Sequence, residues 1–122
     1  MDKAAEYVKQ CEKAVEVQGA WEPAEADFMW NRATEQVDTV RVLRQEPPNY
    51  NHHTERFTWL PRQDQLQEMV SERTSWVLAK DFAAQVYHLS GDTAMSMEQL
   101  WLAFVMHEKY AKTWNGGGWV AH

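Results

Sequence analysis

The chain has 122 residues, which is enough for one domain that buries roughly two-thirds of its unfolded surface without metal or disulfide support. Its formal net charge is −6 and no segment is strongly basic, which argues against direct binding to nucleic acid. The single Cys11 excludes an internal disulfide, and no apolar run has the length of a signal peptide or membrane span. We therefore expect a single cytoplasmic domain over residues 1–122, with no membrane partner.

The first predicted element is an amphipathic helix over residues 2–18. One stripe of this helix is apolar and the remaining positions are mostly charged, which is typical of a helix that packs on a core. Gly19 follows as a plausible end. The inward stripe consists of Ala4, Val8, Cys11 and Val15.

The segment Trp21–Gln45 has two interpretations, and they lead to different fold classes. A helix would place apolar residues from Ala26 to Val40 on one face, which gives an all-α domain. A hairpin would use strands at Asp27–Asn31 and Val37–Leu43, where β-branched residues alternate with polar ones. Periodicity alone slightly favours the helix.

Residues 46–55 contain Pro47, Pro48 and the pair His52–His53, and they predict a flexible surface loop. Phe57–Trp59 then alternates like a short strand. Pro61 suits the first turn of a helix that runs to about Arg73.

Two further helices are predicted in the C-terminal half. Residues 75–89 should bury Ala79, Phe82, Ala83 and Val86. Ser96 and Gln99 form a capping box in front of a helix whose residues 100–106 are all apolar, so this last helix should be central. Residues 115–122 follow as a glycine-rich tail. The core residues predicted for the whole domain are Trp59, Leu66, Phe82, Leu100, Trp101 and Phe104.

No catalytic or cofactor-binding motif is complete in the sequence. His107–Glu108 resembles the start of a zinc-protease helix, but the second histidine that would share the metal is replaced by Ala111. Phosphate loops and cysteine ligand sets are absent. We therefore predict a protein without enzymatic activity, cofactor or metal.

The polar residues least explained by folding lie near Pro61. Asp64, Glu68 and Glu72 recur every four residues, which would align three carboxylates on one helix face. Such a stripe is either a solvated face or a surface that docks on a basic protein. The predicted contact residues for a partner are Arg62, Asp64, Glu68, Glu72 and His52.

The segment Trp59–Met69, read Trp-Leu-Pro-Arg-Gln-Asp-Gln-Leu-Gln-Glu-Met, resembles small uncharacterised proteins of phages and prophages of Gram-positive bacteria. In those sequences a Trp-x-Pro and an Asp-aromatic step stand at the start of what looks like a hairpin. Trp21–Pro23 and Asp27–Phe28 match that pattern, whereas Ala26 stands where a glycine is expected. The resemblance therefore favours the hairpin over the helix.

The fold predicted from residues and resemblance together is α+β. It has an N-terminal helix, a small antiparallel hairpin, a short third strand and three C-terminal helices. The predicted function is that of a phage-encoded accessory or anti-defence protein in the host cytoplasm, which binds a host or phage protein. The alternatives are a structural or assembly protein of the phage, and a metal-dependent hydrolase.

Overall fold

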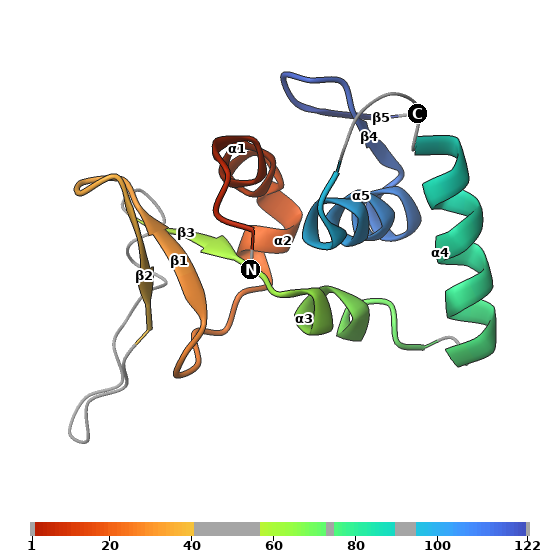
Figure 1. The fold of residues 1–122 in the computed structure, drawn as a ribbon, viewed down its shortest axis with the longest axis horizontal. Coiled ribbons are helices and arrows are strands. Elements are labelled where there is room, and N and C mark those ends of the chain that lie inside the picture. The colour runs from red at the N-terminus through yellow and green to blue at the C-terminus, as the bar shows by residue number, and fades with distance from the viewer. Residues whose placement is uncertain (1, 41–56, 73–74, 90–94, 122) are drawn as a thin grey trace. The chain divides into compact units, whose positions relative to one another are not determined.

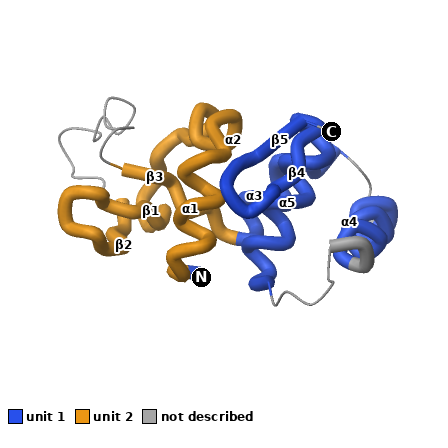
Figure 2. Tube along the Cα trace, turned by 90° about the horizontal axis from the view of Figure 1, so that it is seen from above, with its two compact units in different colours: residues 1–2, 63–122 blue, residues 3–62 orange. Residues whose placement is uncertain are grey.

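A computed structural model of the chain describes residues 2–40, 57–72, 75–89 and 95–121. It contains helices and antiparallel strands, which confirms the α+β class (Figure 1). The chain forms two compact units, residues 3–62 and residues 63–122 with the first two residues (Figure 2). The predicted loop at residues 46–55 lies outside the described residues, and the single domain over residues 1–122 stays a prediction.

The unit of residues 3–62 begins with two helices and continues with three strands. Its elements are α1 (Ala5–Lys13), α2 (Val15–Gly19), β1 (Phe28–Asn31), β2 (Gln36–Thr39) and β3 (Phe57–Leu60). The predicted continuous helix is broken at Ala14, whose backbone leaves the helical region at φ −84° and ψ 70°. The break buries Val17 and exposes Val15, so the prediction that Val15 faces the core was wrong.

The three strands form one antiparallel sheet in the order β2-β1-β3. Trp30 of the central strand lies opposite Val37 on one side and Thr58 on the other. In the connection of the hairpin, the Asn31 side chain accepts hydrogen bonds from the amides of Ala33 and Thr34. The hairpin interpretation is therefore confirmed for residues 21–40, and the all-α alternative was wrong; residues 41–45 of the predicted segment lie outside the described residues.

Side chains of α1 and α2 form hydrogen bonds with β3 and with Pro61, which follows it. The Gln18 amide donates to the Trp59 carbonyl at 2.9 Å and accepts from the Trp59 amide at 2.8 Å. The hydroxyl of the fully buried Tyr7 donates to the Pro61 carbonyl at 2.6 Å. These three bonds give the backbone groups of Trp59 and Pro61 the partners that polar groups inside a fold need.

The unit of residues 63–122 is built around its longest apolar helix. Its elements are α3 (Gln63–Glu68), α4 (Ser75–Leu89), α5 (Met97–Tyr110), β4 (Lys112–Trp114) and β5 (Trp119–Ala121). α5 contacts α3, α4 and β4, and its residues 101–106 are all buried. Ser96 and Gln99 exchange both bonds of the predicted capping box, and the Ser96 hydroxyl also donates to the Asp2 carboxylate. The central position of this helix is confirmed.

Three predictions for this unit were wrong in detail. The helix that starts near Pro61 ends at Glu68, and only turns connect it to residue 72. The described part of the predicted tail, residues 115–121, is not free, because β4 and β5 pair as a hairpin with Trp114 opposite Trp119. On α4, Ala79 and Ala83 are exposed although the periodicity placed them inward.

Most of the predicted core is buried. Trp59, Leu66, Trp101 and Phe104 are at most 5% exposed. Phe82 and Leu100 are partly exposed, but the Phe82 ring stacks on Trp101 with centroids 3.9 Å apart and meets Phe104 edge to face at 5.7 Å. This aromatic cluster joins α4 to α5.

Candidate functional site

The predicted acidic stripe is only partly present. Asp64 and Glu68 are exposed on α3. Glu72 is also exposed, but it follows the helix in turns whose amides bond three residues back, so its spacing no longer aligns it with the other two. His52 lies outside the described residues.

Arg62, the other predicted contact residue, belongs to the unit of residues 3–62 and has a structural role there. Its guanidinium lies 3.6 Å from the Asp27 carboxylate and donates to the Ala26 carbonyl at 3.3 Å. Asp27 is buried, and it also accepts from the Trp21 indole and the Ala24 amide, each at 3.0 Å. These contacts within the fold therefore explain part of why a charged residue stands at position 62.

Ala26, where the resemblance leads us to expect a glycine, has a left-handed backbone with φ 72°. Its amide bonds to the Val40 carbonyl, and the Val40 amide bonds to the Asp27 carbonyl. A residue without a Cβ adopts this conformation at lower cost than alanine does. The position thus has a physical reason to prefer glycine.

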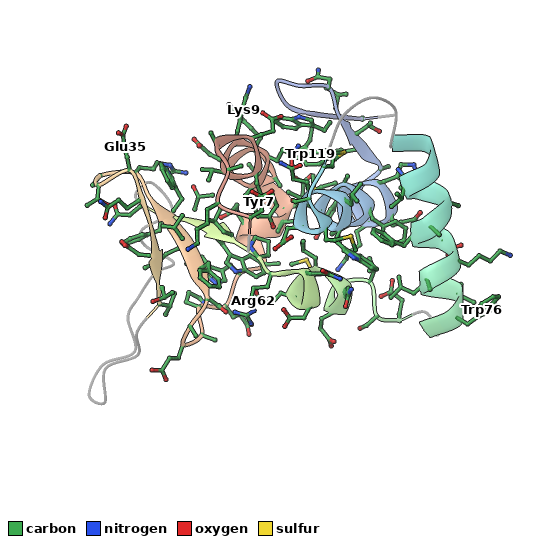
Figure 3. The ribbon with its side chains drawn as sticks, viewed as in Figure 1. Tyr7, Lys9, Glu35, Arg62, Trp76 and Trp119 are labelled. Atoms are coloured by element: carbon green, nitrogen blue, oxygen red, sulfur yellow. The ribbon has the colours of Figure 1, made fainter. Side chains whose placement is uncertain are left out.

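The most exposed large aromatic side chain among the described residues is Trp76 on α4. It is 76% exposed and points away from the helix axis (Figure 3). Its exposed neighbours on the same helix are apolar apart from one lysine, and together we call them the α4 outer face: Trp76, Val77, Ala79, Lys80, Ala83 and Ala84. The opposite side of α4 holds Phe82 against α5.

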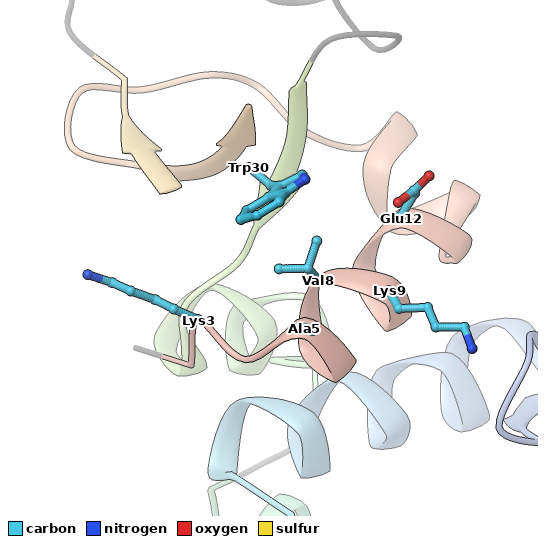
Figure 4. A pocket seen from close by; sticks show the side chains of 6 residues that line it. All are labelled: Lys3, Ala5, Val8, Lys9, Glu12 and Trp30. Carbon is cyan, nitrogen blue, oxygen red and sulfur yellow. The ribbon is translucent and has the colours of Figure 1, made fainter. Parts of the chain in front are cut away.

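The unit of residues 3–62 carries a groove of about 250 Å³ between α1 and β1 (Figure 4). Val8 and Ala5 from α1 and the indole of Trp30 from β1 supply its apolar part. Lys3, Lys9 and Glu12 complete the lining. The groove can hold one side chain of a partner but is small for a whole drug-sized ligand.

Neither of these surfaces was predicted from the sequence. A helix face is visible in the periodicity of residues 75–89, but the choice between its two sides depends on which one meets α5. The groove brings Trp30 to residues on α1 that are distant in sequence, so no local pattern marks it.

The described residues contain no cluster of three or more His, Cys, Asp or Glu side chains that could hold a metal ion. None of the helices within those residues is long and apolar enough to cross a membrane. Comparisons of the chain with known protein families, with curated proteins and with solved structures found no match.

Proposed function

We propose that this is a non-enzymatic, phage-encoded accessory or anti-defence protein that acts by binding a host or phage protein. The observation that carries the proposal is the α4 outer face. A helix that met only water would carry mostly polar side chains on its outer side, yet five of these six residues are apolar. Exposed apolar surface of this kind is typical of an interaction site.

Trp76 is the side chain best suited to anchor a partner. Tryptophan is among the residues most enriched at binding hot spots, because one ring buries a large area with few rotatable bonds. The alanines beside it allow a partner backbone to approach closely. The stacked Phe82 fixes the helix from the other side, so its outer face is presented on a packed element.

The acidic residues of α3 form a second part of the proposed contact surface, in the same unit as α4. Asp64 and Glu68 are exposed, and the whole chain carries a net charge of −6. Exposed carboxylates accelerate association with a basic partner and contribute less to the lifetime of the complex. We therefore propose that the α4 outer face determines the lifetime of the complex and that the acidic residues of α3 accelerate association.

The phage context rests on the resemblance of Trp59–Met69, and the leading alternative is a structural or assembly protein of the particle. Mass spectrometry of purified particles separates the two. An accessory protein is found with a host or phage partner in infected cells, whereas an assembly protein is found in stoichiometric amounts in particles or their precursors.

The contact surface is tested by affinity capture from the lysate of a Gram-positive host with three baits. These are the wild type, Trp76→Ala, and Val15→Ala as a control at a residue that is 65% exposed in the other unit. Both substitutions should change the free energy of unfolding by less than about 0.5 kcal/mol, because the side chains are solvent-facing. We expect a protein that is captured by the wild type and by Val15→Ala but lost with Trp76→Ala.

Photo-crosslinking then locates the contact directly. A crosslinking amino acid at position 76 should join the captured protein, and one at position 15 should not. Equal recovery with all three baits, or crosslinks at position 15 alone, would show that the α4 outer face is not the binding surface.

A further inference from the structure

The groove between α1 and β1 has an apolar centre and charged edges. Ala5, Val8, Lys9 and Glu12 share one side of α1, because residues three and four apart in a helix lie above one another. Trp30 faces them from the central strand of the sheet, which is paired on both sides. The two walls of the groove are therefore regular elements.

Two lysines flank this apolar part. Lys3 and Lys9 extend to opposite sides of Trp30 and Val8, and both are exposed (Figure 4). The Lys3 ammonium lies 5.9 Å from the centre of the Phe28 ring, a distance at which the ring attracts the cation. Both side chains reach the solvent at the edges of the groove.

The one carboxylate of the lining is balanced by a neighbouring cation. The Arg32 Nε lies 3.8 Å from Glu12, and another nitrogen of the same guanidinium donates to the Thr58 hydroxyl at 2.7 Å. Three cations therefore stand against one acid here, in a chain whose net charge is −6. The charge of the groove is opposite in sign to that of the chain as a whole.

We propose that this groove binds an acidic peptide segment, one large apolar side chain of which inserts between Trp30 and α1 while its acidic neighbours meet Lys3 and Lys9. This site is separate from the α4 outer face, and its test does not depend on that surface. A peptide is favoured over single-stranded nucleic acid, because the Glu12 carboxylate can accept hydrogen bonds from peptide amides, whereas a phosphate backbone offers no donor.

The proposal is tested with short blocked peptides and the full chain labelled with ¹⁵N. The probes are Glu-Asp-Phe-Asp-Glu, the basic analogue Lys-Lys-Phe-Lys-Lys, the acidic peptide Glu-Asp-Gly-Asp-Glu without the anchor, and a short oligothymidylate. The readout is the shift of the Trp30 indole N–H, assigned with Trp30→Phe. We expect a saturable shift with the first peptide that is much weaker with the other three.

Variants on exposed positions keep the test independent of folding. Reversing both groove lysines (Lys3→Glu with Lys9→Glu) should weaken the acidic peptide by about tenfold and favour the basic one, since each exposed charge contributes about threefold to the affinity. Lys13→Glu, on the same helix but outside the lining, should change the affinity by less than about twofold. Ala5→Trp should block insertion without a change of charge.

Several outcomes would overturn the proposal. They are equal shifts with acidic and basic peptides, no shift at millimolar acidic peptide, preferential binding of oligothymidylate, and an effect of Lys13→Glu as large as that of the double reversal. Binding of the peptide to the Ala5→Trp variant with unchanged affinity would likewise place the site elsewhere.

Discussion

Both compact units bury apolar side chains, but the long-range contacts that distinguish them differ in kind. In residues 3–62, hydrogen bonds from side chains to distant backbone groups hold the elements together, as between Gln18 and Trp59 and between Tyr7 and Pro61. In residues 63–122, packing around α5 dominates, with Phe82, Trp101 and Phe104 in one aromatic cluster. The first kind of contact depends on exact donor and acceptor positions, whereas the second depends mainly on volume.

This difference bears on which substitutions each unit tolerates. A hydrogen bond between a side chain and a distant backbone group is lost when the substituted side chain cannot donate or accept, even if it has the same shape. A packed cluster accepts changes of chemistry among apolar residues but not loss of volume. The following substitutions test that distinction.

The largest effect is expected for Phe104→Ala. Phe104 is fully buried and contacts two other rings, so its truncation should cost about 3 to 5 kcal/mol through lost burial and the cavity left behind. Urea unfolding followed by far-ultraviolet circular dichroism measures the loss. Phe82→Ala, at a partly exposed ring, should cost less, and near-wild-type stability of Phe104→Ala would contradict the packing description.

Asp27→Ala tests the polar network of the other unit. The substitution leaves the Trp21 indole and the Ala24 amide without their acceptor, which should cost about 2 to 3 kcal/mol. Glu25→Ala, at an exposed acid two residues away, is the control and should change stability by less than about 0.5 kcal/mol. Similar melting temperatures for the two variants would show that the network contributes little.

A pair of substitutions at Gln18 separates hydrogen bonding from volume. Gln18→Glu keeps the size of the side chain but turns the group that faces the Trp59 carbonyl from a donor into an acceptor. We expect a loss of about 1 to 2 kcal/mol, together with faster hydrogen exchange at the Trp59 amide. Gln18→Met, which fills similar space without bonding, should lose a comparable amount. Full stability of the methionine variant would mean that volume alone matters here.

Glycine substitutions at left-handed positions should stabilise both units. Ala26 has φ 72° and Ala111, which ends α5, has φ 52°. Ala26→Gly and Ala111→Gly each relieve a steric cost of about 1 kcal/mol, partly offset by the greater freedom of glycine in the unfolded chain, so each should gain about 0.5 kcal/mol. Differential scanning calorimetry detects the rise in melting temperature. Ala83→Gly, in the middle of α4, should do the opposite.

The smallest effect on stability is expected for the charge reversal Glu68→Lys with Glu72→Lys. Both side chains are exposed, so the free energy of unfolding should change by less than about 0.5 kcal/mol. Binding to a basic partner should slow, and the slowing should diminish at high salt. Unchanged association rates at two salt concentrations would show that these acids are only a solvated surface.

Local signals in the sequence identified the elements whose formation depends on near neighbours. The capping box at Ser96 and the unbroken apolar run after it predicted α5 and its central position, because both belong to one helix. Alternation and turn residues supported the hairpin of β1 and β2, but the resemblance was needed to choose it over a helix.

Features that depend on distant partners could not be found in this way. The side of α4 that faces inward is decided by the rings on α5, so periodicity placed Ala79 and Ala83 wrongly. The hairpin after α5 depends on Asn115, whose side chain accepts from the amides of Gly117 and Gly118, and on the meeting of Trp114 with Trp119. The three glycines were predicted to belong to a tail, because the side chain that stabilises their turn is that of the preceding Asn115.

The hydrogen bond between Tyr7 and Pro61 has a consequence for the order in which the protein folds during synthesis. The two residues are 54 positions apart, and β3, which completes the sheet, lies just before Pro61. A nascent chain that has emerged only as far as β2 can form the hairpin of β1 and β2, but a hairpin of two strands is marginally stable alone. The ribosome must therefore deliver nearly the whole of residues 3–62 before this unit can close.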